Sequence, residues 1–174
     1  VIIRKIDGAE ILRRIEREGV TLLNGAPAVV AAILDAAAAR RARGEPVPGG
    51  GQVRIVVAGA PPPSKTIERV ETELGWEFIQ IYGLTETSPL LTINRAGPEL
   101  DGMDNEEKAR LLARTGPPAL GVQIRVDEHG EVLARSNHVS AWSAGGAEAA
   151  EARRQGGGGR LLEPTRVERQ DHLP

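Results

Sequence analysis

The chain has 174 residues, a formal net charge of −2 and no cysteine. This charge balance leaves no basic surface for a polyanion, so we expect no nucleic-acid partner. The lack of cysteine excludes disulfide bonds, a thiolate nucleophile and thiolate ligands for zinc, and it favours a cytoplasmic protein. Residues 26–39 form the most apolar run, but this run is too short to span a bilayer, which takes roughly 20 residues.

Aromatic residues make up only 2% of the chain, although hydrophobic residues make up 40%. We therefore expect a core of alanine, valine, isoleucine and leucine with few large rings. Three of the four aromatic residues lie close together in the sequence, at Trp76, Phe78 and Tyr82.

Short β-rich runs alternate with amphipathic runs of helical periodicity over residues 1–98. The apolar runs predict strands at residues 1–6, 20–23, 53–58 and 77–82. Capping residues, prolines and glycines bound the predicted helices, which run from Asp7 to Gly19, over 27–43, and from an N-cap at Ser64 to Gly75. The run 53–58 is apolar apart from Arg54, as expected of a strand buried on both faces.

Single helices between successive strands predict parallel βαβ units and an α/β fold. Because such crossovers are right-handed, the segments that follow the strands emerge at one edge of the sheet, where open α/β sheets bind ligands. These segments are Asn24-Gly25, residues 59–63 and residues 83–89.

The pattern changes after residue 98. Residues 99–139 predict a charged helix at 104–114 and a small antiparallel hairpin unit with strands at 121–126 and 131–134. Residues 140–174 lack periodicity and consist mostly of alanine, glycine, arginine and glutamate, so we expect a disordered tail. The abrupt change of composition also fits a tail that is read out of frame in a GC-rich gene.

The most informative segment runs from Tyr82 to Pro89. It offers an aromatic ring, a glycine, three aliphatic hydroxyls and one carboxylate at the end of a predicted strand. Hydroxyls donate to phosphate oxygens, a carboxylate is a ligand for Mg²⁺, and a tyrosine ring can stack on a base. The alternative is a polar strand-to-helix loop in which Thr85 and Ser88 cap the next turn.

The six residues from Tyr82 to Thr87 resemble the YG-x-TE signature of the adenylate-forming superfamily, the AMP-dependent synthetases and ligases. Residues 56–61, followed by a helix and residues 75–89, are similar to the acyl-CoA synthetase branch. The resemblance covers about residues 1–139 and implies an internal fragment of the large N-terminal domain of a fatty-acid–CoA ligase. In that family a carboxylate and ATP form an acyl-adenylate and pyrophosphate, and coenzyme A then takes the acyl group as a thioester.

The resemblance also implies roles for individual residues. Tyr82 stacks on adenine, Thr85 contacts the α-phosphate, and Glu86 binds the Mg²⁺ that neutralises the triphosphate, so Thr85 and Glu86 are the implied catalytic residues. The implied contacts to ATP or AMP come from Gly59, Ala60, Pro61, Tyr82, Gly83 and Thr85. The implied contacts to the carboxylic acid, which we expect to be a fatty acid, come from Gly25, Pro89 and Leu90.

Three features of the family have no counterpart in this sequence. They are the Ser/Thr/Gly-rich phosphate loop, the Thr-Gly-Asp motif and the C-terminal domain with its catalytic lysine. We therefore expect the chain to be inactive alone and to associate with a complementary fragment, because a parallel sheet needs cover on both faces. The alternative, from another functional class, is a non-catalytic α/β module that binds a nucleotide or a protein partner.

Overall fold

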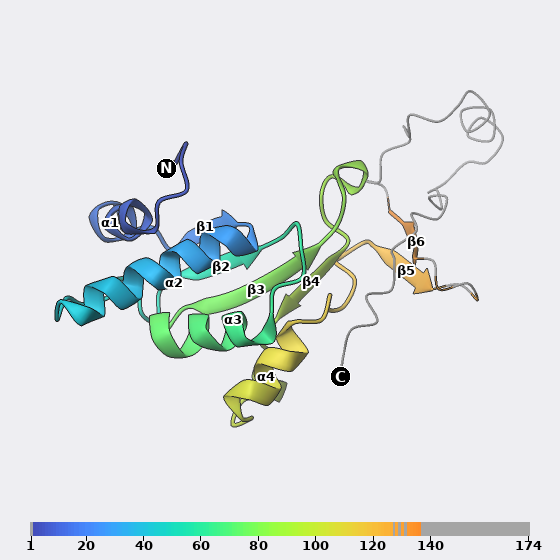
Figure 1. Cartoon of the computed structure of the whole chain (residues 1–174). Helices are drawn as coiled ribbons and strands as arrows, with labels where there is room; N and C mark the ends of the chain where they lie inside the picture. The colour runs from blue at the N-terminus through green and yellow to red at the C-terminus, as the bar shows by residue number, and fades with distance from the viewer. Residues whose placement is uncertain (1, 127, 129, 131, 137–174) are drawn as a thin grey trace. The chain divides into compact units, whose positions relative to one another are not determined.

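The computed structural model describes residues 2–126, 128, 130 and 132–136 (Figure 1). The chain divides into two compact units, which we describe separately. The first unit comprises Val1–Tyr82 and Ile93–Gly116, and the second comprises Gly83–Thr92 with the residues from Pro117 onward. The predicted tail, residues 140–174, lies outside the described residues.

The first unit consists of helices packed on a four-stranded sheet of order β1-β2-β3-β4. Its strands are β1 (Leu22–Gly25), β2 (Arg54–Val57), β3 (Glu77–Tyr82) and β4 (Thr92–Arg95). Its helices are α1 (Gly8–Glu18), α2 (Pro27–Ala42), α3 (Ser64–Arg69) with the π-helical turn η1 (Val70–Leu74), the 3₁₀ turn η3 (Pro98–Leu100), and α4 (Asn105–Leu112).

The predicted parallel sheet is confirmed for three of the four strands. Leu22 of β1 pairs with Arg54 of β2, and Arg54 pairs with Glu77 of β3, all in parallel register. Arg95, the last residue of β4, forms an ion pair with Glu77, the first residue of β3. β4 therefore runs antiparallel to β3 (Figure 1). The sequence did not predict β4, because four residues are too few to show a clear alternation.

Two of the sequence predictions are wrong in detail. Residues 2–6 form no strand, and Ile2 and Ile6 are 90% and 58% exposed, because no described strand pairs with them. Ser64 is the first residue of α3 and not its N-cap. Pro63 holds the N-cap position, and its side chain makes no capping hydrogen bond. The predicted start of α1 is confirmed, because Asp7 accepts hydrogen bonds from the backbone N–H groups of Ala9 and Glu10 at 3.0 and 3.1 Å.

The core of the first unit lies on one face of the sheet. Aliphatic side chains dominate it, as the composition predicts, and Trp76 and Phe78 supply its large rings. The Trp76 indole N–H donates to the carbonyl oxygen of Pro48 at 3.0 Å, so its polar edge is satisfied. In β2, Ile55 and Val57 are fully buried, but Val56 between them is only half-buried. The prediction that this strand is buried on both faces is therefore wrong for the described residues.

Helix α4 packs against α3 within the first unit, although the sequence grouped it with the hairpin. Two side chains of the sheet anchor its C-terminal end. The Asn94 amide donates to the carbonyl oxygens of Leu111 and Arg114 at 2.8 and 2.7 Å. The buried Gln80 amide, oriented with its nitrogen toward α4, donates to the carbonyl oxygen of Leu112 at 2.9 Å. These bonds satisfy carbonyl groups that the helix itself leaves without partners.

The second unit contains the predicted hairpin, which is confirmed. Its strands β5 (Gln123–Val126) and β6 (Val132–Arg135) are antiparallel, with Gln123 opposite Arg135 and Val126 opposite Val132. The unit also holds the 3₁₀ turn η2 (Thr85–Thr87). The backbone N–H of Ala119 donates to the carbonyl oxygen of Leu91 at 2.8 Å and joins this loop to the segment before β5.

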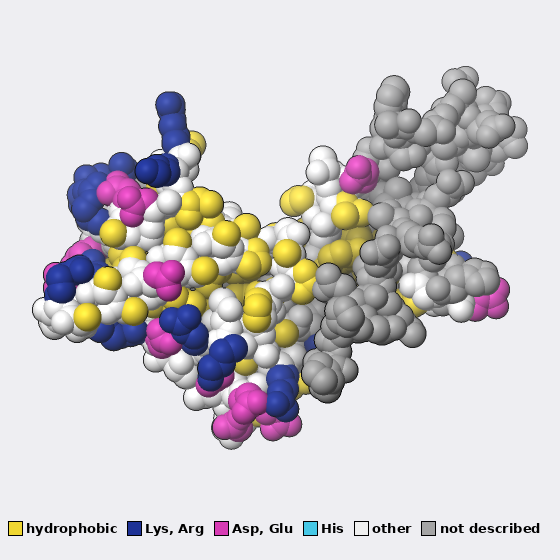
Figure 2. Space-filling view, viewed as in Figure 1, with side chains coloured by type: hydrophobic (Ala, Val, Ile, Leu, Met, Phe, Trp, Pro, Cys, Tyr) yellow, Lys and Arg dark blue, Asp and Glu magenta, His cyan; other side chains and the backbone are white. Residues whose placement is uncertain are grey.

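Charged side chains gather on the outer helices of the first unit, around α1 and α4, and hydrophobic side chains lie in the region of α2 and β1 (Figure 2). On α1, Arg13 and Arg14 form ion pairs with Glu10 at 2.7 and 2.6 Å, which lower the pKa of that carboxyl. None of the helices within the described ranges is long and apolar enough to cross a membrane.

Candidate functional site

The carboxyl ends of the three parallel strands lie at one edge of the first unit. Gly25 ends β1, the segment from Ala58 to Pro61 follows β2, and Tyr82 ends β3. The Ala58 N–H donates to the carbonyl oxygen of Gly25 at 3.3 Å, so the first two of these segments touch. The strand register thus brings together the predicted site residues of the first unit, as the crossover rule requires.

The loop after β2 is open to solvent. Gly59, Ala60 and Pro61 are all exposed, and a Cβ added at Gly59 would meet no atom within 4 Å. Gly59 has a φ of +94°, a left-handed conformation that side chains with a Cβ rarely adopt. The glycine is therefore required by its backbone angle, and the loop leaves free space beside it.

Tyr82 is half-buried at the end of β3. Burial raises the pKa of its phenol above the ordinary value. The side chain is therefore uncharged at neutral pH and combines an apolar ring with a hydroxyl donor, a combination that suits stacking on a base.

Thr87 organises the loop of the second unit. Its side chain is fully buried, and its hydroxyl accepts from the Leu84 N–H at 2.8 Å and donates to the Leu84 carbonyl oxygen at 2.9 Å. The sequence did not single out this residue, because nothing in the local pattern distinguishes it from Thr85. The alternative in which Thr85 and Ser88 cap the turn is wrong, since Thr87 makes the capping bonds.

Thr85 and Glu86 lie on the same turn with exposed side chains. Within the part of the chain that the structure describes, neither side chain takes part in a hydrogen bond or ion pair with another residue. The turn is therefore stabilised by the hydroxyl of Thr87 and presents the hydroxyl of Thr85 and the carboxylate of Glu86 to solvent. A hydroxyl donor next to a carboxylate can serve a phosphate and its counter-cation together.

The described side chains suit a Mg²⁺ ion that is also bound by phosphate oxygens better than they suit a metal ion bound by side chains alone. No group of three or more acidic or histidine side chains that could hold a metal occurs among the described residues. Mg²⁺ commonly takes one or two carboxylates and completes its shell with phosphate oxygens and water. Glu86 supplies one such carboxylate, exposed and without a partner among the described residues.

Gly83 closes the loop of the second unit by close backbone contact. A Cβ added there would lie 1.8 Å from the carbonyl oxygen of Pro89 and 2.9 Å from the Cα of Leu90. The family resemblance implies a role for this glycine toward the ligand, and the structure adds a steric one. Pro89 is exposed and Leu90 half-buried, so of these two predicted substrate contacts Pro89 is the more accessible.

We expect Gly83→Ala to destabilise this loop by about 1–3 kcal/mol, because the clash is with backbone that cannot rotate away. Hydrogen exchange of the Leu84 and Thr87 amides, both bonded inside the loop, measures the effect. Gly50→Ala is the matched control, because its added Cβ would meet only the Leu74 carbonyl oxygen, at 3.8 Å. Unchanged exchange in the Gly83 variant would show that the loop does not depend on this contact.

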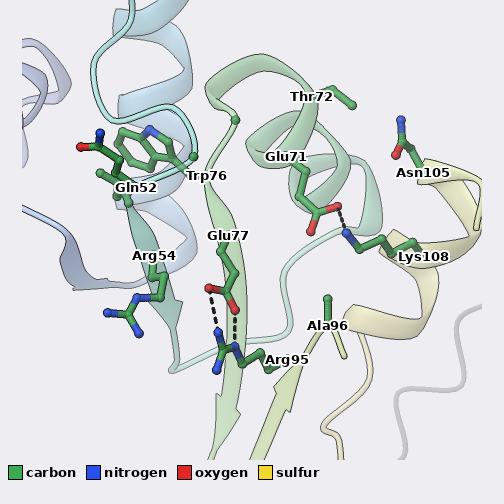
Figure 3. A pocket seen from close by; sticks show the side chains of 13 residues that line it. Gln52, Arg54, Glu71, Thr72, Trp76, Glu77, Arg95, Ala96, Asn105 and Lys108 are labelled. Atoms are coloured by element: carbon green, nitrogen blue, oxygen red, sulfur yellow. Dashed lines mark hydrogen bonds and ion pairs between the residues drawn. The ribbon is translucent and has the colours of Figure 1, made fainter. Parts of the chain in front are cut away.

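A hollow of about 690 Å³ lies at the opposite edge of the sheet, at the amino-terminal ends of β2 and β3 (Figure 3). Ion pairs line it, between Glu77 and Arg95 and between Lys108 and Glu71, the latter at 3.1 Å. None of the site residues predicted from the sequence lines this hollow.

Comparison with known proteins identifies the family. Residues 1–141 match the model of the AMP-binding enzyme family. The long-chain-fatty-acid–CoA ligase of Thermus thermophilus is 37% identical over 127 residues, which cover 72% of this chain and 22% of that protein. The 2-methylpropanoate–CoA ligase of Humulus lupulus is 33% identical over 153 residues, 80% of this chain and 26% of that protein. The chain thus spans about a quarter of the length of these relatives.

A solved structure shares the fold. The O-succinylbenzoate coenzyme A synthetase of Bacillus subtilis, determined with ATP and magnesium ion, aligns with a TM-score of 0.61 at 20% identity over 84% of this chain and 29% of that chain. Because the family match spans most of the sequence, the chain belongs to the AMP-binding enzyme family, and the relatives that it resembles are acyl-CoA ligases.

Proposed function

We propose that this chain carries part of the ATP site of an acyl-CoA ligase. In the whole protein, a carboxylate would attack the α-phosphate of ATP to give an acyl-adenylate and pyrophosphate, and the thiol of coenzyme A would then displace AMP to give the thioester. The proposed roles are adenine stacking for Tyr82, an α-phosphate contact for Thr85 and a Mg²⁺ ligand for Glu86. A Mg²⁺ ion bound there would neutralise charge on the phosphates.

One observation carries this proposal. The turn after β3 holds two threonines and a glutamate, and it buries only Thr87 for its own hydrogen bonds. Thr85 and Glu86 remain exposed and free of described partners. A triphosphate with its cation requires both kinds of group, a hydroxyl donor and a carboxylate, side by side.

We propose that the carboxylic acid lies beside Gly25, Pro89 and Leu90, and that Gly59, Ala60 and Pro61 border both the acid and the adenine. The exposed, open backbone around Gly59 supports this, because it leaves room for a ligand at close range. We favour a fatty acid as the substrate, because the Thermus thermophilus relative bears that name. The Humulus lupulus relative is named for a short branched acid, so chain length is the property to test first.

The groups in this chain support only weak ATP binding by themselves. One adenine stack contributes about 1–3 kcal/mol and a hydrogen bond about 1 kcal/mol. A millimolar complex needs a net of roughly 4 kcal/mol after association costs of about 4 kcal/mol or more. We therefore propose that this chain alone binds ATP more weakly than millimolar and forms no acyl-adenylate. Micromolar ATP binding by calorimetry, or pyrophosphate release with a fatty acid, would contradict this part of the proposal.

The adenine contact can be tested by replacing Tyr82. We expect Tyr82→Ala to weaken ATP binding by the value of one stack, about 1–3 kcal/mol, whereas Tyr82→Phe keeps the ring and the affinity. Titration of the labelled chain with ATP, followed by the NMR shifts of the amides at residues 82–87, measures both variants. If Tyr82→Ala binds ATP as the parent chain does, Tyr82 is not the adenine contact.

A further inference from the structure

Two threonines flank Glu86 on the 3₁₀ turn of the second unit, and only one of them is exposed. Thr85 is open to solvent, whereas the Thr87 side chain is fully buried. A buried hydroxyl needs hydrogen-bond partners, because an unpaired hydroxyl costs free energy when it leaves water. The partners of Thr87 therefore show what this side chain does.

Those partners are the two backbone groups of a single residue, Leu84. The Thr87 hydroxyl accepts from the Leu84 N–H at 2.8 Å and donates to the Leu84 carbonyl oxygen at 2.9 Å. The Thr87 N–H donates to the same carbonyl oxygen at 3.0 Å. These three bonds close residues 84–87 into a ring, and the two residues between the bonded ones are Thr85 and Glu86.

The backbone is also bonded on the far side of Thr87. The Ser88 N–H donates to the carbonyl oxygen of Thr85 at 3.2 Å, and the Leu90 N–H donates to the carbonyl oxygen of Thr87 at 3.2 Å. Ser88 has a φ of +51°, a left-handed conformation that ends the turn. The backbone that carries Thr85 and Glu86 is thus held from both directions.

The shape of this backbone decides where the two exposed groups can go. Within the part of the chain that the structure describes, neither the Thr85 hydroxyl nor the Glu86 carboxylate bonds another residue. Such side chains lose rotamer freedom when they bind a ligand. The position from which each side chain starts is the part of the binding geometry that the protein can fix in advance.

We propose that Thr87 is a positioning residue for the Mg²⁺–phosphate contacts of Thr85 and Glu86. Its hydroxyl holds the turn in the one shape that presents a hydroxyl and a carboxylate together to a phosphate and its cation. The inference rests on the proposed function, which supplies the ligand. Because its side chain is fully buried, Thr87 acts through its neighbours and not by contact with the substrate.

Two replacements of Thr87 separate its hydroxyl from its packing. Thr87→Val keeps the branched shape but leaves the Leu84 N–H without its partner, whereas Thr87→Ser keeps the hydroxyl. Amide relaxation by NMR on the full chain without ligand measures the mobility of residues 85–87. We expect the order parameters in Thr87→Val to fall from about 0.85 to below about 0.6, and those in Thr87→Ser to stay at the parent values.

The second measurement is the change of the amide shifts at residues 85 and 86 with Mg²⁺–ATP. Because binding is weak, the shift change at a fixed ATP concentration follows the affinity. We expect it to fall about fivefold in Thr87→Val, the effect of losing one net hydrogen bond that keeps the turn competent to bind, and to recover in Thr87→Ser. Thr72→Val is the matched control, since it removes a hydroxyl that donates to the Glu68 carbonyl oxygen at 2.7 Å in the first unit.

Thr85→Val distinguishes a contact residue from a positioning residue. We expect it to reduce the shift changes with ATP but to leave the mobility of the amides as in the parent chain, because its hydroxyl makes no bond within the turn. Thr87→Val should change both measurements.

The outcomes separate the positioning role from the proposed function. If the parent chain shows Mg²⁺-dependent shifts that Glu86→Gln removes and Thr87→Val keeps, the positioning role is wrong and the function stands. If Thr87→Val makes the turn mobile but leaves the shifts with Mg²⁺–ATP unchanged, Thr87 is structural only, and the inference is again overturned. If the parent chain shows no Mg²⁺-dependent shifts, the proposed function fails and the positioning role fails with it.

Discussion

Replacing Phe78 with alanine is expected to lower the free energy of unfolding by about 3–5 kcal/mol. Phe78 is fully buried in the core of the first unit, between the strands and their helices. The chain has few aromatic residues, and no other phenylalanine is present to take over the lost volume. The aliphatic neighbours can collapse only in part, so the variant retains a cavity. Urea unfolding of the dilute chain, followed by tryptophan fluorescence, measures the effect.

Ile79→Ala is the matched control for this prediction. Ile79 is the next residue of the same strand but lies on the other face of the sheet, half-buried and outside the core cluster. Its loss should cost about 1 kcal/mol or less, because less contact is removed. Equal costs for the two variants would show that the strand is buried on both faces and would contradict this prediction.

Glu86→Gln is expected to abolish the strengthening of ATP binding by Mg²⁺ and to leave the fold intact. The substitution keeps the size of the side chain but removes the negative charge that a Mg²⁺ ligand supplies. Interactions with a charged group contribute about 1.5–3 kcal/mol. Because the parent chain is expected to bind ATP more weakly than millimolar, this loss should make the shifts that depend on Mg²⁺ disappear, while the shifts seen with ATP and a chelator stay as in the parent chain. Titrations with ATP in the presence of Mg²⁺ and in the presence of a chelator, followed by NMR, compare the amide shifts of the parent chain and the variant.

Glu99→Gln serves as the control, because Glu99 is also exposed and also lies on a 3₁₀ turn. It should leave the Mg²⁺ dependence unchanged. If both variants behave as the parent chain, Glu86 holds no metal and the chain is better described as a module without a Mg²⁺–nucleotide site. If Tyr82→Ala weakens binding while Glu86→Gln does not, the adenine contact stands and only the metal role is wrong.

Local sequence signals located the helices and the parallel strands well. The Asp7 cap and Gly19 bound α1 as predicted, and the apolar run before Tyr82 is β3 at the predicted residues. These features depend on neighbours in the sequence, so periodicity and capping residues reveal them. The run at residues 1–6 has equally high β-propensity, yet its described residues form no strand, because a strand also needs a partner that local sequence does not supply.

In the candidate site, too, the sequence and the tertiary structure determine different properties. The motif from Tyr82 to Thr87 predicted by itself the family, which the comparisons confirm, and it singled out the candidate segment for the chemistry. Only the tertiary structure decided that Thr87 is buried in the hydrogen bonds of the turn while Thr85 and Glu86 stay exposed. It also decided that a side chain at Gly83 would meet the Pro89 carbonyl and that Val56 and Ile79 lie outside the core cluster. These properties arise from contacts between residues that are distant along the chain, or from contacts that form when a loop folds back on itself. Side-chain periodicity carries no information about such contacts.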